Sequence, residues 1–175
     1  MNKFLIAYLF FLPGGVANMA PVLANRVPWL NSWKTPLDFG QKYKGKRIFG
    51  PNKTWRGLFS GIALAGFVAY VEAATIYQAS PKYVVLVTLL GMLMGFGALA
   101  GDAIESFFKR QHGVPSGNSW FPFDQLDYIF GGLIVVMPFL KWDSGLVLII
   151  IAEYFGLHLI TSYIAFKLGL KSKPI

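Results

Sequence analysis

The chain has 175 residues, 55% of them hydrophobic and 14% charged, and its 16 lysines and arginines against 8 acids give a net charge of +8. Soluble domains average about 25% charged residues, so this chain has too few to cover a globule in water. The composition therefore excludes a soluble enzyme, a disordered linker and a secreted mini-protein, and indicates an integral membrane protein. Cysteine is absent, which excludes disulfides, iron–sulfur clusters and cysteine zinc sites.

Five apolar stretches are candidates for membrane-spanning helices, because about 20 apolar residues cross about 30 Å of hydrocarbon. They cover residues 4–24, 57–77, 83–101, 124–140 and 145–168. The uninterrupted apolar part of the fourth stretch starts at Tyr128, so its helix is long enough only if it begins near Asp124. We therefore predict an all-α integral membrane protein, a bundle of about five transmembrane helices that forms a single domain over residues 1–175.

The basic residues indicate which helix ends face the cytoplasm. Thirteen lysines and arginines lie in the loops 25–56 and 102–123 and in the C-terminal tail, and three lie in the opposite segments. An excess of positive charge marks the cytoplasmic side of a membrane protein. We expect the N-terminus outside, the C-terminus inside, and both polar loops on the cytoplasmic face of the cell membrane, where nucleotides are found.

Half of the acidic residues lie in one stretch that begins at the end of the third predicted helix. If that helix continues into the cytoplasm, four polar residues share one of its faces at positions i, i+3, i+4 and i+7. They are Asp102, Glu105, Ser106 and Lys109. An ion pair of Glu105 and Lys109 could simply solubilise the helix end, but that explanation leaves Asp102 without a role.

A second pair of carboxylates lies at the start of the fourth predicted helix. Asp124 and Asp127 are one turn apart, and Pro122 suits the beginning of a helix. Helix capping explains Asp124 but not a second carboxylate one turn deeper. Carboxylates are costly at membrane depth and persist where they line a watery cavity. Because oxygen ligands without a histidine or cysteine cluster favour hard cations, we predict a Mg²⁺ site. Its ligands are Asp102, Glu105, Asp124 and Asp127.

The loop before the second predicted helix is strongly basic, with seven lysines and arginines against one acid in residues 34–56. Its segment Gly-Pro-Asn-Lys-Thr is not a Walker motif, because no glycine precedes the Lys-Thr pair and the proline lacks an N–H group. Lys53, Thr54 and Arg56 lie at the mouth of the helix and suit a polyphosphate. The lysines further upstream are explained by attraction to anionic head groups.

Polar residues also mark the end of the first predicted helix. Asn18 and Asn25 are seven residues apart and share a face, Pro21 interrupts the helix between them, and Arg26 follows. Polar side chains beside such a break can line a ligand cavity. Contacts between helices explain the two asparagines equally well.

These motifs are similar to a known signature. Gly101-Asp102, Glu105-Ser106 and Lys109-Arg110, followed by Asp124 and Asp127, resemble the G-D-x-x-E-S-x-x-K-R and D-R-x-D motifs of the CTP-dependent phosphatidate cytidylyltransferases. The segments 24–26 and 50–57, together with the small number of helices, resemble the archaeal branch of that family, the CDP-archaeol synthases. The resemblance extends over nearly the whole chain, although Gln125 stands where the family motif has arginine.

The resemblance implies a reaction and roles for the residues. The implied reaction transfers a cytidylyl group from CTP to 2,3-bis-O-geranylgeranylglycerol 1-phosphate in the membrane, with Mg²⁺ as cofactor and no nucleic-acid partner. It gives CDP-archaeol and pyrophosphate. The implied catalytic residues are Asp102, Asp124, Asp127 and Lys109. The implied substrate-binding residues are Asn18, Asn25, Arg26, Lys53, Thr54, Arg56, Ser106 and Arg110.

Two other classes of function fit part of the pattern. A lipid-phosphate kinase or a phosphoglycosyltransferase would use similar carboxylates with another nucleotide. A small cation channel or transporter would also place acids at a pore mouth, but it would not need a basic, glycine-punctuated loop beside them.

Overall fold

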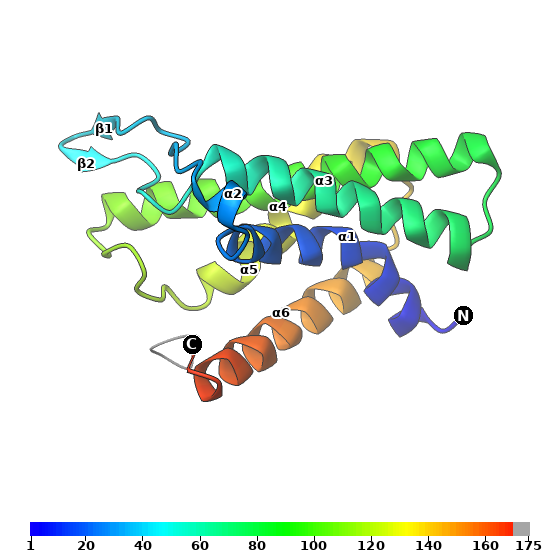
Figure 1. Cartoon of the computed structure of the whole chain (residues 1–175). Helices are drawn as coiled ribbons and strands as arrows, with labels where there is room; N and C mark the ends of the chain where they lie inside the picture. The colour runs from blue at the N-terminus through cyan, green and yellow to red at the C-terminus, as the bar shows by residue number, and fades with distance from the viewer. Residues whose placement is uncertain (170–175) are drawn as a thin grey trace.

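The computed structural model describes residues 1–169 and is mostly helical (Figure 1). Its helices are α1 Lys3–Ala24, α2 Pro28–Asn31, α3 Trp55–Val71, α4 Pro81–Gln111, α5 Phe123–Val136 and α6 Ser144–Lys167. A π-helical turn, η1 Glu72–Ile76, extends α3, and a 3-10 turn, η2 Met137–Phe139, extends α5. The two-residue strands β1 Lys42–Tyr43 and β2 Lys46–Arg47 pair as an antiparallel hairpin, which the apolar pattern does not predict. Lys171 and Lys173 of the predicted cytoplasmic tail lie outside the described residues.

Each of the five predicted spans contains a helix. Among the described residues, four helices are long and apolar enough to cross a membrane: Lys3–Ala24, Trp55–Ile76, Pro81–Gln111 and Ser144–Lys167. The remaining one, α5, has 14 residues and is shorter than the predicted 124–140. The α-helical hydrogen bonding ends near Pro138, which lacks the N–H group for a helical hydrogen bond, and the chain continues as the 3-10 turn η2.

The first helix differs from its prediction in one respect. α1 runs through Pro13 and Pro21 to Ala24, so the interruption predicted at Pro21 does not occur. A proline removes a single backbone hydrogen bond, and membrane helices tolerate it when neighbouring helices support the chain. Asn25 is therefore the C-terminal cap of α1 rather than a residue beyond a break.

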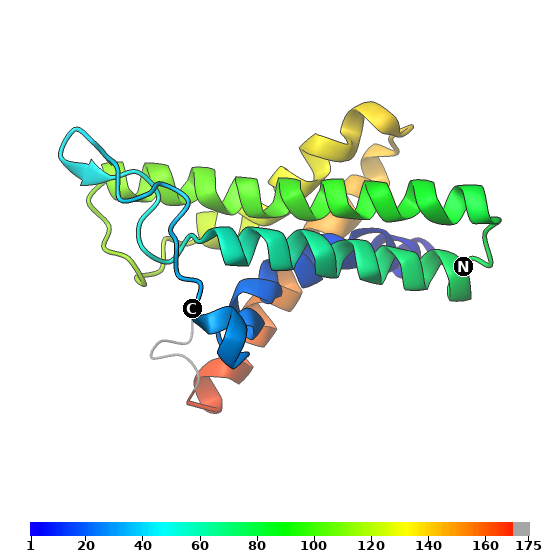
Figure 2. The same ribbon diagram turned by 45° about the horizontal axis from the view of Figure 1, so that its top comes forward.

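The helices form a bundle that is open on one side. Figures 1 and 2 show α3 and α4 side by side along their length, whereas α6 diverges from them toward its C-terminal end. The β1–β2 hairpin and the segment between α4 and α5 lie at one end of the bundle, and the N-terminus lies at the other (Figure 1). The two polar loops that were predicted to share the cytoplasmic face therefore share one end of the molecule.

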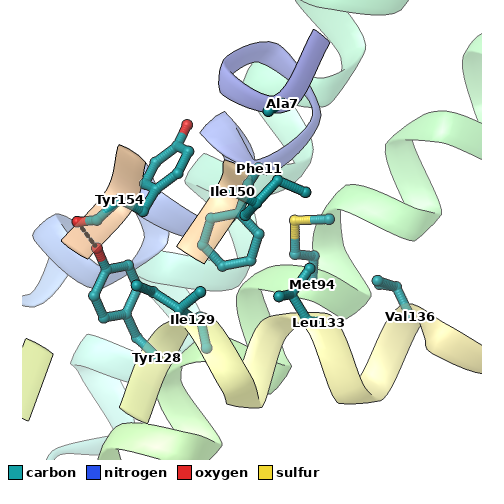
Figure 3. Packing of buried hydrophobic residues seen from close by; sticks show 10 residues of the cluster. Ala7, Phe11, Met94, Tyr128, Ile129, Leu133, Val136, Ile150 and Tyr154 are labelled. Carbon is teal, nitrogen blue, oxygen red and sulfur yellow. Dashed lines mark hydrogen bonds between the residues drawn. The ribbon is translucent and has the colours of Figure 1, made fainter. Parts of the chain in front are cut away.

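A buried core joins α1, α4, α5 and α6 (Figure 3). Phe11 of α1 packs edge-on against Tyr154 of α6, with ring centroids 4.9 Å apart. The Tyr128 hydroxyl donates a hydrogen bond to the Tyr154 carbonyl oxygen (3.0 Å), and the Tyr154 hydroxyl donates one to the Tyr8 carbonyl oxygen (2.6 Å). Because an unpartnered buried hydroxyl is costly, these bonds fix α1, α5 and α6 relative to one another.

Glycines allow α4 and α5 to approach closely. A Cβ atom at Gly101 would lie 2.3 Å from the Asp127 carbonyl oxygen, and one at Gly131 would lie 2.3 Å from the Gly97 carbonyl oxygen. These distances leave no room for a side chain, so the two backbones are in contact, as at other small-residue contacts between membrane helices. The contact holds the start of α5, with its two acids, beside the acidic face of α4.

Asp38 organises the basic loop before α3. Its buried carboxylate accepts hydrogen bonds from the Arg47 guanidinium (2.6 and 3.2 Å) and from the backbone N–H groups of Gly40, Phe49 and Gly50 (3.0, 3.0 and 3.1 Å). Burial alone would raise the pKa of Asp38, but these donors lower it to about 2. The single acid of this loop is therefore a structural residue that folds the chain around it.

Candidate active site

The acidic face predicted on α4 is present in the structure. The helix continues to Gln111, so Asp102, Glu105, Ser106 and Lys109 lie on successive turns of one side. Glu105, Ser106 and Lys109 are buried, even though two of them are ionisable. Burial of charged groups is costly unless they are paired or bind a ligand, so this face is more than a solvated helix end.

Three carboxylates from α4 and α5 form a compact group. The side chains of Asp102, Glu105 and Asp127 each offer an oxygen atom, and these atoms lie within 4.8 Å of one another. Glu105 Oε1 is buried and accepts no hydrogen bond from the described residues. Neighbouring carboxylates repel one another unless positive charge offsets them. Because hard divalent cations prefer oxygen ligands of this kind, the donor set fits Mg²⁺.

Lys53 supplies positive charge to this group. Its Nζ lies 2.5 and 2.6 Å from the two carboxylate oxygens of Asp102. Burial would lower the pKa of Lys53, but the nearby carboxylates, Asp102 first among them, raise it above its usual value. Lys53 is held in place by the start of α3, where Thr54 Oγ1 accepts a hydrogen bond from a backbone N–H of the first turn (3.2 Å).

Asp124 pairs with a different cation. Its carboxylate accepts a hydrogen bond from Lys109 Nζ and another from the Trp120 backbone N–H (2.6 Å). Lys109 Nζ also lies 3.9 Å from Glu105 Oε1. The four acids predicted as one ligand set therefore divide into a group of three and an Asp124–Lys109 pair beside it.

A polar cavity of about 470 Å³ lies beside these groups, and this volume is within the range of about 300–1,000 Å³ for small-molecule sites. Asp127, predicted as a catalytic residue and metal ligand, is not among its lining residues. Its charged lining residues are Lys53, Lys109 and Arg110 and the acids Asp102, Glu105 and Asp124. Asn18 and Ser106, both predicted to bind substrate, also line it. Asp102 and Asp124, which come from separate helices, thus face one cavity.

Four of the predicted substrate-binding residues do not line this cavity: Asn25, Arg26, Thr54 and Arg56. The buried Arg56 guanidinium donates hydrogen bonds to the Leu30 carbonyl oxygen (3.1 Å), to Asn31 Oδ1 (3.3 Å) and to Asn25 Oδ1. It thereby attaches α2 to the end of α1. Lys53 contacts Asp102, whereas Arg56 contacts the ends of α1 and α2, so the two cations that were predicted to hold the triphosphate together have different partners.

The cavity also contains residues to which we assigned no role from the sequence, among them Asn52, Ser116, Asn118, Gln125 and His158. The Asn52 side chain donates a hydrogen bond to Ser116 Oγ (3.0 Å) and so joins the two polar loops. An ionisable residue inside a membrane span often has a function, so the position of His158 in the fifth predicted span could have indicated it. Ser116 and Asn118 are not part of any motif, and their position depends on how the two loops fold against each other.

The protein is an apolar helical bundle, and carboxylates and cations cluster in a polar cavity at one end of it. This architecture suits an enzyme embedded in a membrane. Comparison with known proteins agrees with this class. A solved structure of an intramembrane enzyme for archaeal membrane lipid biosynthesis superimposes with a TM-score of 0.77 and 31% sequence identity, over 90% of this chain and 93% of that one.

The whole chain, residues 1–175, matches the family described as CarS-like, CDP-archaeol synthase. The CDP-archaeol synthase of Thermococcus onnurineus is 34% identical over 99% of this chain and 98% of its own length. The CDP-archaeol synthase of Pyrococcus abyssi is 33% identical over 99% of both chains. The chain therefore belongs to the CDP-archaeol synthase family, and it is a multi-pass membrane protein that transfers a cytidylyl group in archaeal membrane lipid biosynthesis. The kinase and channel alternatives are set aside.

Proposed function

We propose that the nucleotide is CTP, that the acceptor is 2,3-bis-O-geranylgeranylglycerol 1-phosphate, and that the reaction requires Mg²⁺. The products are CDP-archaeol and pyrophosphate. The observation that carries this proposal is the approach of Asp102, Glu105 and Asp127 to within 4.8 Å of one another, beside a cavity rich in lysine and arginine. A triphosphate and a lipid phosphate repel each other, so a site that joins them needs concentrated positive charge.

The three clustered carboxylates would hold the metal ion, which when bound offsets charge on the phosphates and on the departing pyrophosphate. Lys53 already contacts Asp102, so a phosphate group held by Lys53 lies next to the metal ligands. Lys109 and Arg110 provide further positive charge on the cavity wall. Asp124 fixes the Lys109 ammonium group by a direct hydrogen bond.

The reaction requires no nucleophile from the protein, because the acceptor phosphate is already anionic. One of its oxygens attacks the α-phosphorus of CTP and forms a new P–O bond. The bond from that phosphorus to the oxygen bridging to the β-phosphate breaks, and its electron pair leaves with pyrophosphate. The protein contributes by holding the two phosphates close together and in line, and by offsetting their charge.

We infer that this chemistry takes place on the cytoplasmic side of the cell membrane. The loops around the cavity carry most of the chain's lysines and arginines, which favours that orientation. It also places the cavity where CTP is available, while the acceptor remains in the bilayer.

The proposal is tested by incorporation of labelled CTP into lipid, using purified protein in liposomes that contain the acceptor. Asp102→Asn should lower the rate by about 100-fold or more, because it replaces a charged ligand of the divalent metal by a neutral and weaker one. Asp143→Asn is the matched control, since Asp143 caps α6 and pairs with Lys3 at the opposite end of the bundle. Chelation of Mg²⁺ should stop the wild-type enzyme, and ATP should not replace CTP. Near-normal turnover by Asp102→Asn, or turnover without divalent metal, would refute the assignment.

A further inference from the structure

Two apolar grooves run along the outside of the bundle. The α1–α6 groove has a volume of about 400 Å³, and its apolar lining includes Leu12, Val16, Met19, Leu157 and Ala165. The α1–α3 groove has a volume of about 520 Å³, and its lining includes Leu23, Trp33, Phe59, Ala63 and Phe67. Either groove is large and apolar enough for part of a lipid, so size alone does not select one of them.

Only the α1–α6 groove shares lining residues with the polar cavity. Asn18 and His158 line both, so groove and cavity meet between these two side chains. Within the described part of the chain, no residue lines both the cavity and the α1–α3 groove. The charged residue in that second groove is Arg56, whose guanidinium donates hydrogen bonds to the Leu30 carbonyl oxygen and to Asn25. The Ser60 hydroxyl also lines it and donates a hydrogen bond to the Gly57 carbonyl oxygen. A lipid phosphate there would lie behind the loop that Arg56 holds in place.

The α1–α6 groove also faces outward from the bundle. In the most apolar window of α6, 11% of the residues are buried, compared with 39% in α1 and 33% in both α3 and α4. Figures 1 and 2 show the reason, since α6 diverges from the other helices toward its C-terminal end. A lipid can therefore reach this groove sideways from the bilayer, while its head remains at the level of the cavity.

The junction between groove and cavity has suitable chemistry for a phosphomonoester. The Asn18 amide and the His158 imidazole both carry N–H groups that can donate to phosphate oxygens. The His158 ring is positioned against Tyr128, with centroids 5.7 Å apart, and Tyr128 is fixed by its hydrogen bond to the Tyr154 carbonyl oxygen. The junction is thus built on the rigid core that joins α1, α5 and α6.

We propose that the acceptor lipid binds with an apolar chain in the α1–α6 groove and with its phosphate passing between Asn18 and His158 into the cavity. This inference rests on the proposed function, because it identifies where the lipid substrate of that reaction is held. Asn18 and His158 are positioning residues for the acceptor.

The test compares tryptophan substitutions that fill one groove each. Ala165→Trp fills the α1–α6 groove, and Ala63→Trp is the matched control in the α1–α3 groove. Ala165→Trp should raise the KM for the geranylgeranyl acceptor by about ten-fold, the equivalent of about two buried methylene groups, and leave the KM for CTP unchanged. A short-chain acceptor phosphate should be used equally well by both variants. A larger effect of Ala63→Trp, or equal effects of the two variants, would overturn the proposal.

A second measurement does not depend on activity. The chain contains no cysteine, so Ala165→Cys and Ala63→Cys each introduce a single thiol. Added geranylgeranyl acceptor should slow labelling of Cys at position 165 by a maleimide and leave labelling at position 63 unchanged; protection at position 63 alone, or at neither, would overturn the proposal. If the wild-type protein failed to use CTP, the proposed function would fail, while this labelling would still decide where the lipid binds.

Discussion

The close contact between α4 and α5 determines how the carboxylates of the two helices are placed, and a substitution at Gly101 tests this. Gly101 directly precedes Asp102, and a Cβ atom at this position would lie 2.3 Å from the Asp127 carbonyl oxygen and 3.0 Å from Gly131 Cα. Both neighbours are backbone atoms of α5, so no side chain can rotate out of the way. Gly101→Ala must therefore push the two helices apart at the point where their carboxylates meet.

The expected losses of rate and stability in Gly101→Ala follow from the same distances. Ordinary van der Waals contact begins at 3.4 Å, so the Cβ atom needs roughly 1 Å more room than the native structure provides. A displacement of about 1 Å at a catalytic centre costs about 100-fold in rate. Overpacking of this kind also costs about 1–3 kcal/mol of stability, so the variant should still fold in detergent but unfold at a lower temperature.

The assay is the initial rate of CTP incorporation at saturating acceptor, together with a thermal unfolding curve for each variant. Gly156→Ala is the matched control, because a Cβ atom there meets no other atom within 4 Å. It should retain full activity and equal or greater stability, since alanine favours helix by about 0.5–1 kcal/mol. If Gly101→Ala retained activity within two-fold of the wild type, the close contact of α4 and α5 would not determine the geometry of the carboxylates.

Three further predictions address individual residues. Glu105→Gln should raise the Mg²⁺ concentration for half-maximal activity by about ten-fold, because it removes charge from the ligand set; an unchanged Mg²⁺ titration would exclude Glu105 as a ligand. Arg56→Met should cost about 2–3 kcal/mol of stability through lost charged hydrogen bonds while leaving the KM for CTP close to normal, and the opposite pattern would show that Arg56 contacts the triphosphate. Asp38 has a pKa of about 2 in the folded protein, below its usual 3.8. Its ionised carboxylate therefore stabilises the loop fully above pH 4, and this stabilisation is lost as the pH falls toward 2. Hydrogen exchange in residues 38–50 should therefore accelerate over that acidic window, and Asp38→Asn should abolish the change.

Local patterns in the sequence were sufficient for much of the site. The spacing of Asp102, Glu105, Ser106 and Lys109 predicts a shared helical face, and α4 has that face because helical periodicity depends only on neighbouring residues. The two acids at the start of α5 were expected to join it, and both lie near it in the structure. The break predicted at Pro21 was wrong, because tertiary support lets α1 continue through the proline.

Contacts between distant segments could not be predicted in the same way. Asp102 pairs with Lys53, 49 residues away, and Asp124 pairs with Lys109 rather than joining the three-carboxylate group. Arg56 was grouped with Lys53 because the two residues are close in sequence. In the structure α3 begins between them, and their side chains contact different partners. Each of these outcomes depends on how helices and loops pack, and no short sequence window contains that information.

The sequence by itself determined that this protein is a mostly helical membrane protein and that acids and cations gather near the ends of its helices, because composition and periodicity act locally along the chain. Only the tertiary structure decided which carboxylates meet, which cations face them, and which apolar groove opens into their cavity. The physical reason is the close backbone contact of α4 with α5 and the divergence of α6, which bring together or separate residues far apart in the chain.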